Sequence, residues 1–484
     1  MARRIQLPRD VIVSFAKSLY RRLPVSVRSV AATIQGLQLH WWRYGAAADR
    51  AAEEALGREH WSHARWSAWR QERLAQALDH AATRVPYYRE LWAARRRRGD
   101  RTSWELLENW PILEKQELRR APRAFVADDW SVRRMQHVRT SGTTGTPLDL
   151  WRSRAAVQTL YGIGISRTRG WHGVTLRDRR AMLGGQVVTP FEQQRPPFWV
   201  WNAAMGQLYM SIHHLAPDLV PHDLDALARY RVRYIAGYSS SIHTLAEEAI
   251  RLGRDDLRMV VVLANSEPLL PHQREMIGRA FHCQVRETYG MAENVASATE
   301  CEAGGLHQWP EVGVTEVVDG HCPVPPGTTG DFVCTGLLNP GMPLIRYRVG
   351  DCGRVPPEDT ACSCGRTLPL MTSIDGRIDD ILWSRDGRRV YRLEPVLYGV
   401  PLHEAQIVQE HVDRVRVRVV PAMGFAPESE RIVADRIRER MGDVGIVFEH
   451  VRQIPRTKAG KFRLVQCELP AAQREALLSL RQAS

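Results

Sequence analysis

The stretch RYIAGYSSSIHTLAEEAIRLG, Arg233 to Gly253, contains a short apolar run, a serine-rich turn and a helical pattern that ends at a glycine. Leu257 to Phe281 repeats this plan, with a polar loop at Asn265–Glu267 between the apolar run and the helical pattern. CQVRETYGMAEN, Cys283 to Asn294, then adds a strand pattern that runs into a loop. Repeated strand–loop–helix segments predict an α/β fold with a largely parallel sheet, in which ligands bind at the carboxyl ends of the strands.

The regions on either side of this central part have a different character. Residues 1–130 are mainly helical in pattern, with large apolar side chains at near-helical intervals. Residues 310–375 are rich in Pro and Gly and contain short β signals, which predict a β-rich subdomain. Beyond them strand and helix patterns alternate again. We therefore predict a large N-terminal domain over residues 1–377 and a smaller C-terminal α/β domain over residues 378–484.

Length and composition indicate a soluble protein of two or more domains. A chain of 484 residues with 44% hydrophobic and 25% charged residues is too long for one ordinary core. No segment reaches the ~18 uninterrupted apolar residues of a membrane span. The basic first 24 residues lack the long apolar centre of a signal peptide, so we expect a cytoplasmic protein. A helix there could dock on a membrane surface or pack on the protein itself, and the second alternative is favoured.

The net charge of +13 does not by itself identify a partner. Nucleic-acid binding usually requires a concentrated basic patch with interleaved aromatic residues. The one dense basic run, Arg95–Arg98, precedes Gly99 and is interpreted as a solvated loop. We therefore expect no nucleic-acid partner, and a basic surface also suits the attraction of polyphosphate substrates.

Four cysteine and histidine side chains suggest a metal site. The pattern is Cys301-x5-His307, followed later by Cys362-x-Cys364. Three thiolates and one imidazole complete a tetrahedral Zn²⁺ site, which would be structural because no open position remains. The spacing is not that of a standard zinc finger, so buried free thiols beside an unrelated histidine remain the alternative. The other cysteines are expected to be reduced.

HVRTSGTTGTPLDLW, His137 to Trp151, has the composition of a loop that binds phosphate. Its glycines allow close approach of the backbone, and its hydroxyls suit phosphate oxygens or Mg²⁺. The residues concerned are Ser141, Gly142, Thr143, Thr144 and Gly145. The loop lacks the lysine that ends an ordinary P-loop, and solvent loops share its composition, so the motif is weak evidence when taken alone.

Four further segments follow this loop in the chain. They are ETYGMAEN (Glu287–Asn294), YRVGD (Tyr347–Asp351), DGRIDD (Asp375–Asp380) and PRTKAGKFR (Pro455–Arg463). With TSGTTGTP, this ordered set resembles the adenylate-forming superfamily of acyl-CoA synthetases, luciferases and peptide-synthetase adenylation domains. WPILEKQELR and CSCGRTLP are similar to the phenylacetate–CoA ligase branch and its CapK-like relatives of capsule biosynthesis. The resemblance covers about residues 80–465.

This resemblance implies the adenylate-forming enzyme fold and an AMP-forming ligase. The carboxylate of a small acid would attack the α-phosphate of ATP, and pyrophosphate would leave. The acyl group of the resulting acyl-adenylate would pass to an acceptor, which is CoA by default. Mg²⁺ is the implied cofactor, and the mobile C-terminal domain would carry a catalytic lysine.

Individual site residues follow from the same resemblance. Glu293 would hold Mg²⁺ together with Thr144 or Thr143, since hard cations prefer oxygen ligands. Lys461 would reach the charge that develops at the α-phosphate. Other residues implied at the nucleotide are Ser266, Glu267, Glu287, Thr288, Tyr289 against adenine, Asp351 at the ribose hydroxyls and Arg377 near the hinge. Asp379 or Asp380 would act as the hinge, and Tyr238 and Ser240 would border the acyl pocket.

Some alternatives stay open. The acceptor could instead be an amine or a carrier-protein thiol, and a non-catalytic homologue is the alternative from another class. The presence of both Glu293 and Lys461 argues against a non-catalytic chain. Many relatives carry a lysine in the phosphate loop at the position of Thr146 or Leu148, and this chain has none there. The oligomeric state is not predicted, and a homodimer is kept open.

Overall fold

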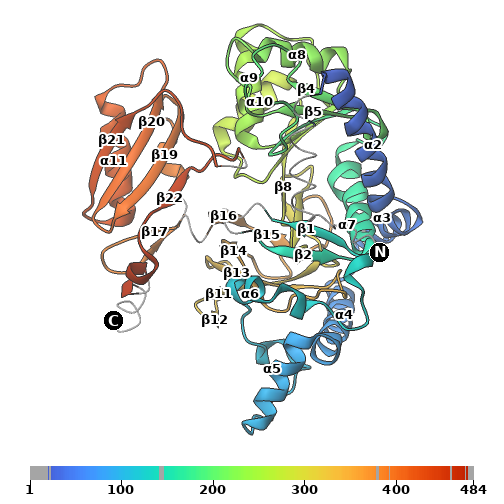
Figure 1. Cartoon of the computed structure of the whole chain (residues 1–484). Helices are drawn as coiled ribbons and strands as arrows, with labels where there is room; N and C mark the ends of the chain where they lie inside the picture. The colour runs from blue at the N-terminus through green and yellow to red at the C-terminus, as the bar shows by residue number, and fades with distance from the viewer. Residues whose placement is uncertain are drawn as a thin grey trace, which may run out of the picture. The chain divides into compact units, whose positions relative to one another are not determined.

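The computed structural model describes residue 20 and residues 23–140, 147–377, 381–391, 393–457, 460–474 and 476–477. The chain divides into two compact units. The first contains residues up to 55 and residues 161–287, and the second contains residues 56–160 and 288–484. The chain crosses between them within α3 (Ala46–Arg58), near the middle of α7 (Arg154–Gly164) and within β8 (Gln284–Gly290), all labelled in Figure 1.

The first unit is built on a mostly parallel sheet in the order β7, β6, β3, β5, β4. The strands are β3 (Arg180–Gly184), β4 (Trp199–Asn202), β5 (Gln207–Ser211), β6 (Tyr234–Gly237) and β7 (Val261–Asn265). Only β4 is antiparallel to its neighbour. The helices α8 (Val220–Arg229), α9 (Ser239–Arg251) and α10 (Pro271–Phe281) pack their apolar faces against this sheet. The predicted α/β fold with a largely parallel sheet is therefore confirmed.

The connection from β6 to α9 shows why the sequence folds this way. β6 is paired with β3, and a Cβ atom at Gly237 would lie 2.0 Å from the carbonyl oxygen of Leu183. Only glycine permits this close approach at the end of the strand. The serine run begins α9 directly after Tyr238, so the predicted strand, turn and helix are all present.

Helices also dominate the N-terminal part, as predicted. They include α2 (Val25–Arg43), α4 (His63–Arg84), α5 (Pro86–Arg97) and α6 (Lys115–Arg120), with short 3₁₀ turns at Leu107–Asn109, Pro122–Phe125 and Val132–Arg134. The first 19 residues lie outside the described residues. No helix of the described residues is long and apolar enough to cross a membrane.

The prediction that Arg95–Arg98 form a solvated loop is wrong. The first three of these arginines form the last turn of α5. The guanidinium carbon of Arg95 lies 4.5 Å from the centroid of the Trp92 ring, and the side chain donates to the backbone oxygen of Asn109. Arginine stems pack well on aromatic surfaces, and cations are stabilised at a helix C-terminus. This explains why Arg95 and Arg96 are half-buried, whereas Arg97 and Arg98 are exposed.

The second unit contains antiparallel β-structure where the Pro/Gly-rich region predicted it. Its five-stranded sheet has the order β12, β11, β13, β14, β16. These strands are β11 (Gly313–Asp319), β12 (Cys322–Pro323), β13 (Gly330–Gly336), β14 (Tyr347–Arg354) and β16 (Ser373–Arg377). β9 (Ser297–Glu300) pairs with the end of β8 and with β10 (Leu306–Gln308), which pairs with β15 (Leu370–Met371). β1 (Gln136–Arg139) and β2 (Asp149–Arg152) form a separate antiparallel pair.

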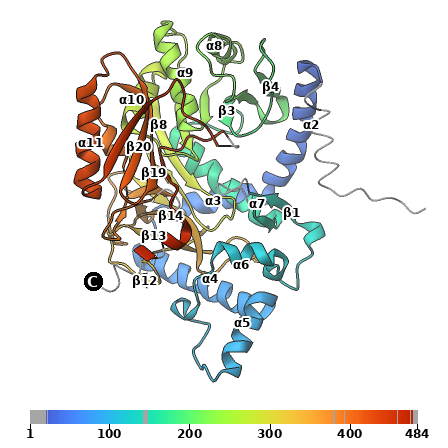
Figure 2. The ribbon, with the colours of Figure 1, turned by 60° about the vertical axis from the view of Figure 1, so that its left-hand side comes forward.

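The C-terminal part of the chain forms a small α/β structure with its own core. Its four-stranded sheet has the order β21, β20, β19, β22, and a short hairpin of β17 and β18 precedes it. The elements are β17 (Leu382–Trp383), β18 (Arg389–Val390), a 3₁₀ turn at Glu394–Leu397, β19 (Leu402–His411), β20 (Arg414–Pro421), α11 (Pro427–Met441), β21 (Gly445–His450) and β22 (Val465–Cys467). α11 lies along one face of the sheet (Figure 2), where Val433 and Ile437 pack on valines of β20.

Candidate active site

Three of the predicted nucleotide-binding residues meet in the second unit. The Tyr289 hydroxyl donates to Oδ2 of Asp351 over 2.8 Å, and Nη1 of Arg377 lies 3.1 Å from Oδ1 of the same carboxylate. Asp351 on β14 is paired in register with Arg377 on β16, which explains why the two side chains face each other. Burial raises the pKa of Tyr289 well above its ordinary value, so its hydroxyl stays a donor.

Glu293, in the turn between β8 and β9, forms a second cluster with Tyr347 of β14. The hydroxyl of Tyr347 donates to Oε1 of Glu293 over 3.0 Å. Tyr347 and Asp351 both belong to β14, and Lys115, next to Glu293, is close enough to Asp351 and Arg377 for its pKa to respond to both charges. Burial raises the pKa of Tyr347, so this hydroxyl also keeps its proton. The predicted magnesium ligand and the predicted ribose ligand are therefore presented by one strand and its neighbours.

Lys115 belongs to this cluster and was not predicted. Its Nζ atom lies 3.8 Å from Oε1 of Glu293 and 6.0 Å from the centroid of the Tyr347 ring. Burial lowers the pKa of Lys115, and the Glu293 carboxylate opposes that shift. The backbone of Leu113 pairs with β14, which brings the start of α6 to this place.

One compositional signal could have identified Lys115. The chain contains 67 basic residues, of which only four are lysines, at positions 17, 115, 458 and 461. A lysine in a chain whose other basic residues are almost all arginines suggests that a compact ammonium group is needed at that position. Both Lys115 and Lys461 satisfy that criterion.

The predicted phosphate loop falls outside the described residues, and so do the hinge residues Asp379 and Asp380. The loop residues concerned are Ser141, Gly142, Thr143, Thr144 and Gly145. The residues that flank the loop are described. Thr140 and Leu148 are joined by two hydrogen bonds of 3.0 Å, one between their backbones and one from the Leu148 amide to the Thr140 hydroxyl. The loop therefore connects the paired strands β1 and β2.

Other predicted residues lie in the first unit or at its boundary. Glu267 accepts a hydrogen bond of 2.7 Å from the Ser240 hydroxyl and one of 3.2 Å from the Ser240 amide at the start of α9. Ser266 has a positive φ of 66°, in the loop that follows β7. Tyr238 is buried immediately before α9. Glu287 and Thr288 lie on β8 with Tyr289.

Lys461 lies in a tight turn of the C-terminal part. The Thr457 amide donates to the Lys461 carbonyl over 2.9 Å, and the Lys461 amide donates to the Thr457 hydroxyl over 3.0 Å. Gly460 has a φ of 76°, a conformation that glycine adopts without strain. These bonds fix the backbone at Lys461, and its reach toward a nucleotide stays a prediction.

The four predicted zinc ligands are brought together in the second unit. Sγ of Cys301 lies 3.7 Å from Sγ of Cys362, and Sγ of Cys364 lies 3.2 Å from Nε2 of His307. All four ligand atoms lie within 4.8 Å of one another. Atoms about 2.3 Å from one tetrahedral Zn²⁺ are about 3.8 Å apart, so this donor set fits the ion in chemistry and in spacing. All eight cysteines are free thiols.

The surroundings of this Cys/His cluster also fit a metal site. Nδ1 of His307 lies 3.2 Å from the carbonyl oxygen of Leu368, which orients Nε2 toward the thiols. A Cβ atom at Gly305 would lie 2.6 Å from Sγ of Cys362, so only glycine leaves room for the thiol. The cluster joins the β9–β10 turn to the segment before β15.

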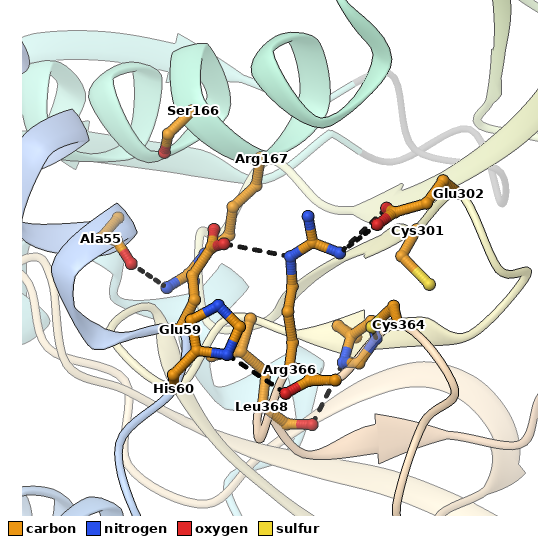
Figure 3. A network of polar contacts seen from close by, with 12 residues as sticks. Ala55, Glu59, His60, Ser166, Arg167, Cys301, Glu302, Cys364, Arg366 and Leu368 are labelled. Carbon is orange, nitrogen blue, oxygen red and sulfur yellow. Dashed lines mark hydrogen bonds and ion pairs between the residues drawn. The ribbon is translucent and has the colours of Figure 1, made fainter.

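Arg366 connects the cluster to neighbouring carboxylates (Figure 3). Its guanidinium donates to Glu59 over 3.0 Å and to both oxygens of Glu302 over 2.8 and 2.9 Å. Burial raises the pKa of the Cys364 thiol, but hydrogen bonds with the backbone and side chain of Arg366 outweigh burial and lower it below its ordinary value. The Arg366 guanidinium beside the thiols is thus paired with the carboxylates of Glu59 and Glu302.

The fold is shared with a solved CoA ligase. A crystal structure of 2-hydroxyisobutyryl-CoA ligase in the postadenylation state superposes with a TM-score of 0.65 at 22% sequence identity. The match covers 88% of this chain and 94% of that chain. An open conformation of the same enzyme gives a TM-score of 0.53, also at 22% identity, over 85% of this chain and 93% of that chain. These similarities confirm the predicted fold class.

Sequence comparison then identifies the branch. Residues 382–468 match the CapK C-terminal domain family. Protein CapK of Staphylococcus aureus is 27% identical over 301 residues, which are 60% of this chain and 65% of CapK, slightly less than two thirds of that relative. Phenylacetate-coenzyme A ligase of Thermus thermophilus is 27% identical over 449 residues, which are 82% of this chain and 95% of that enzyme. The chain is thus similar in sequence to phenylacetate-coenzyme A ligases and to CapK, in line with the resemblance of its sequence motifs.

Proposed function

We propose that this protein is an ATP-dependent, AMP-forming ligase that activates a small carboxylic acid as an acyl-adenylate and transfers the acyl group to CoA. The observation that carries the proposal is the pair of clusters around Asp351 and Glu293, to each of which β14 contributes one residue. Asp351 with Tyr289 and Arg377 offers contacts for a nucleoside, and Glu293 with Lys115 offers contacts for a metal-bound polyphosphate. The phenylacetate–CoA ligases among its relatives support the choice of substrates.

The reaction has two balanced steps. A carboxylate oxygen of the acid attacks the α-phosphorus of ATP, the bond from that phosphorus to the β-phosphate oxygen breaks, and pyrophosphate leaves. The sulfur of CoA then attacks the acyl carbon, the bond to the AMP oxygen breaks, and the thiol proton passes to solvent. The first step needs no general base, because a carboxylic acid is already ionised at neutral pH.

The nucleoside contacts assign a role to three residues. The Tyr289 ring would lie against adenine, since flat aromatic surfaces stack on bases. Asp351 would accept from the ribose hydroxyls. Its two oxygens each bond one side chain in the described structure, and an ionised carboxylate offers about four acceptor positions in all. Arg377 would hold the carboxylate in place beside the nucleotide.

The phosphate contacts combine Glu293, Thr143 and Thr144 with Lys115. Carboxylate and hydroxyl oxygens are ligands that Mg²⁺ prefers, so these residues would hold the ion. Bound there, Mg²⁺ would neutralise phosphate charge. Lys115 supplies a cation next to Glu293, which offsets the missing lysine of the phosphate loop. The hydroxyls of Ser141 and the amides at Gly142 and Gly145 would complete the cradle.

The C-terminal domain would deliver a second cation. We place its boundary at residues 377 and 378, with Asp379 or Asp380 as the hinge. The CapK C-terminal domain match begins at residue 382, and the separate core of this part of the chain also supports the division. Rotation of the domain would bring Lys461 to the α-phosphate for the first step and remove it for the second.

Further nucleotide and acyl contacts belong to the same proposal. Ser266, Glu267, Glu287 and Thr288 would border the nucleotide. Tyr238 and Ser240 would border the acyl group, with Ser240 positioned by its bonds to Glu267. We assign the activity to the cytoplasm, where ATP and CoA are supplied.

We also assign a structural Zn²⁺ ion to Cys301, His307, Cys362 and Cys364. A closed tetrahedral site would join two loops of the second unit and take no part in the reaction. Elemental analysis of protein purified without chelators should find about one Zn²⁺ per chain. Metal-free protein whose thiols all titrate freely would show that the cluster is only a group of packed cysteines.

The acceptor is tested by product analysis. The purified protein is incubated with ATP, Mg²⁺, a panel of aryl and acyl carboxylates, and either CoA, an amine or a carrier-protein thiol. We expect mass spectrometry to find AMP and an acyl-CoA. An amide or an acyl-carrier product instead would redirect the second step, and the absence of AMP formation with every acid would show a non-catalytic homologue.

A further inference from the structure

The helix α2 has one face that is anchored to the first unit. Arg28 is buried and donates to the carbonyl oxygen of Val188 over 3.3 Å and to Gln193 over 2.8 Å. The Ser29 hydroxyl accepts from the Trp201 amide over 3.2 Å. A Cβ atom at Gly36 would lie 2.2 Å from the Asn202 side chain, so the helix backbone packs closely there. These contacts fix which face of α2 points outward.

The opposite face carries a continuous apolar stripe that is exposed. Its side chains are between 43% and 63% exposed, and they are Val27, Val30, Ile34, Leu37 and Trp41. At 100° per residue these positions fall within an arc of about 80°, and they extend over about 21 Å of helix. Single exposed apolar residues are ordinary, whereas a stripe of five on one helix face indicates a binding surface.

The sequence that contains and precedes α2 is strongly basic. Residues 1–48 contain eight basic side chains and one acidic side chain, and their net charge of +7 is more than half of the total of +13. Six of the basic residues precede α2 in the sequence, and they are Arg3, Arg4, Arg9, Lys17, Arg21 and Arg22. Within α2 the charged residues are the buried Arg28 and Arg43 in the last turn. The helix α2 therefore carries no acidic group, and the sequence before it contains one, Asp10.

We infer that α2 docks by this apolar stripe on a membrane surface that contains anionic lipids. An amphipathic helix lies in the interface when apolar side chains, tryptophan among them, enter the acyl boundary and nearby basic residues meet anionic headgroups. A second copy of the chain would bring two strongly positive segments together, which disfavours self-association through this face. Nucleic acid would meet the positive charge but not the exposed aliphatic side chains.

The test measures lipid binding by the full-length protein. Co-sedimentation is compared for phosphatidylcholine vesicles with and without phosphatidylglycerol. We expect binding to the anionic vesicles that weakens with added salt. The double variant Ile34→Glu/Leu37→Glu should bind about tenfold more weakly or worse, since two apolar contacts are replaced by charges. The matched control is Met423→Glu/Val447→Glu, which adds the same charges at exposed apolar positions outside α2.

Each other outcome overturns the inference. Equal sedimentation with both kinds of vesicle would exclude a preference for anionic lipids. Sedimentation with neither kind would exclude membrane binding and would fit a stripe that is covered by the N-terminal segment. Equal loss in both double variants would show an effect of net charge alone. A wild-type dimer that becomes monomeric only in the α2 variant would identify the stripe as a contact between copies. Melting temperature checks that all variants fold, and ligase activity on a dissolved acid is measured separately.

Discussion

Replacing Glu293 by Gln tests the proposed phosphate site at its centre. Gln keeps the shape and an acceptor for the Tyr347 hydroxyl, but it removes the charge next to Lys115. The variant should therefore fold normally. At 3.8 Å and an effective dielectric constant of about 20, the attraction between Glu293 and Lys115 is about 4 kcal/mol, and the net contribution to stability is much smaller because both charges lose hydration. We expect a loss of about 1 kcal/mol of unfolding free energy.

The effect of this change on catalysis should be much larger than its effect on stability. A group that stabilises charge in a transition state contributes roughly 3–4 kcal/mol. Part of that loss is offset because Lys115 is then released to face the phosphates. We expect adenylation, measured as carboxylate-dependent pyrophosphate release, to slow by about 10- to 100-fold, with a matching rise in the Mg²⁺ concentration required.

Tyr347→Phe is the matched control for Glu293→Gln. It removes the hydrogen bond to Glu293 and leaves the carboxylate charge, so we expect less than about tenfold loss of adenylation. Wild-type activity of Glu293→Gln at limiting Mg²⁺ would show that another residue is the ligand. Equal losses in both variants would show that Glu293 acts only through its bond to Tyr347.

Three other predictions concern lysines and the Cys/His cluster. Lys461→Ala should slow adenylation by roughly 10²–10³ and leave transfer from a supplied acyl-adenylate nearly unchanged, whereas equal losses in the two steps would indicate a structural lysine. Lys115→Met should slow adenylation about tenfold with partial recovery in Lys115→Arg, and unchanged pyrophosphate release would exclude it from the phosphate site. Cys364→Ser should lose Zn²⁺ and lower the melting temperature, while Cys322→Ser, at an exposed cysteine of β12, should keep both, and equal metal content in the two would refute the zinc assignment.

Much of the fold could be predicted because its signals are local. The strand, serine turn and helix at Tyr234–Arg251 are consecutive in sequence, and each part has its own periodicity. The Cys/His cluster could be predicted from ligand types alone, since few other arrangements use three thiols and an imidazole. Asp351 and Arg377 were assigned by motif, and strand pairing explains their contact.

Contacts that depend on packing were not accessible in the same way. Lys115 reaches Glu293 only because Leu113 pairs with β14, and nothing near Lys115 in the sequence indicates that pairing. Composition predicts that the run Arg95–Arg98 is solvated, because composition does not show that the Arg95 side chain packs on the Trp92 ring. Similarly, the periodicity of α2 predicts an apolar stripe but not which face of the helix the first unit covers.

The most direct test of the central claim is carboxylate-dependent exchange of labelled pyrophosphate into ATP without any acceptor. Exchange requires a reversible acyl-adenylate step and does not depend on CoA, an amine or a carrier protein. We predict exchange with at least one acid of an aryl and acyl panel, and its loss in Glu293→Gln and Lys461→Ala. No exchange with any acid, or acid-dependent formation of ADP in place of AMP, would contradict the assignment of this protein as an adenylate-forming ligase.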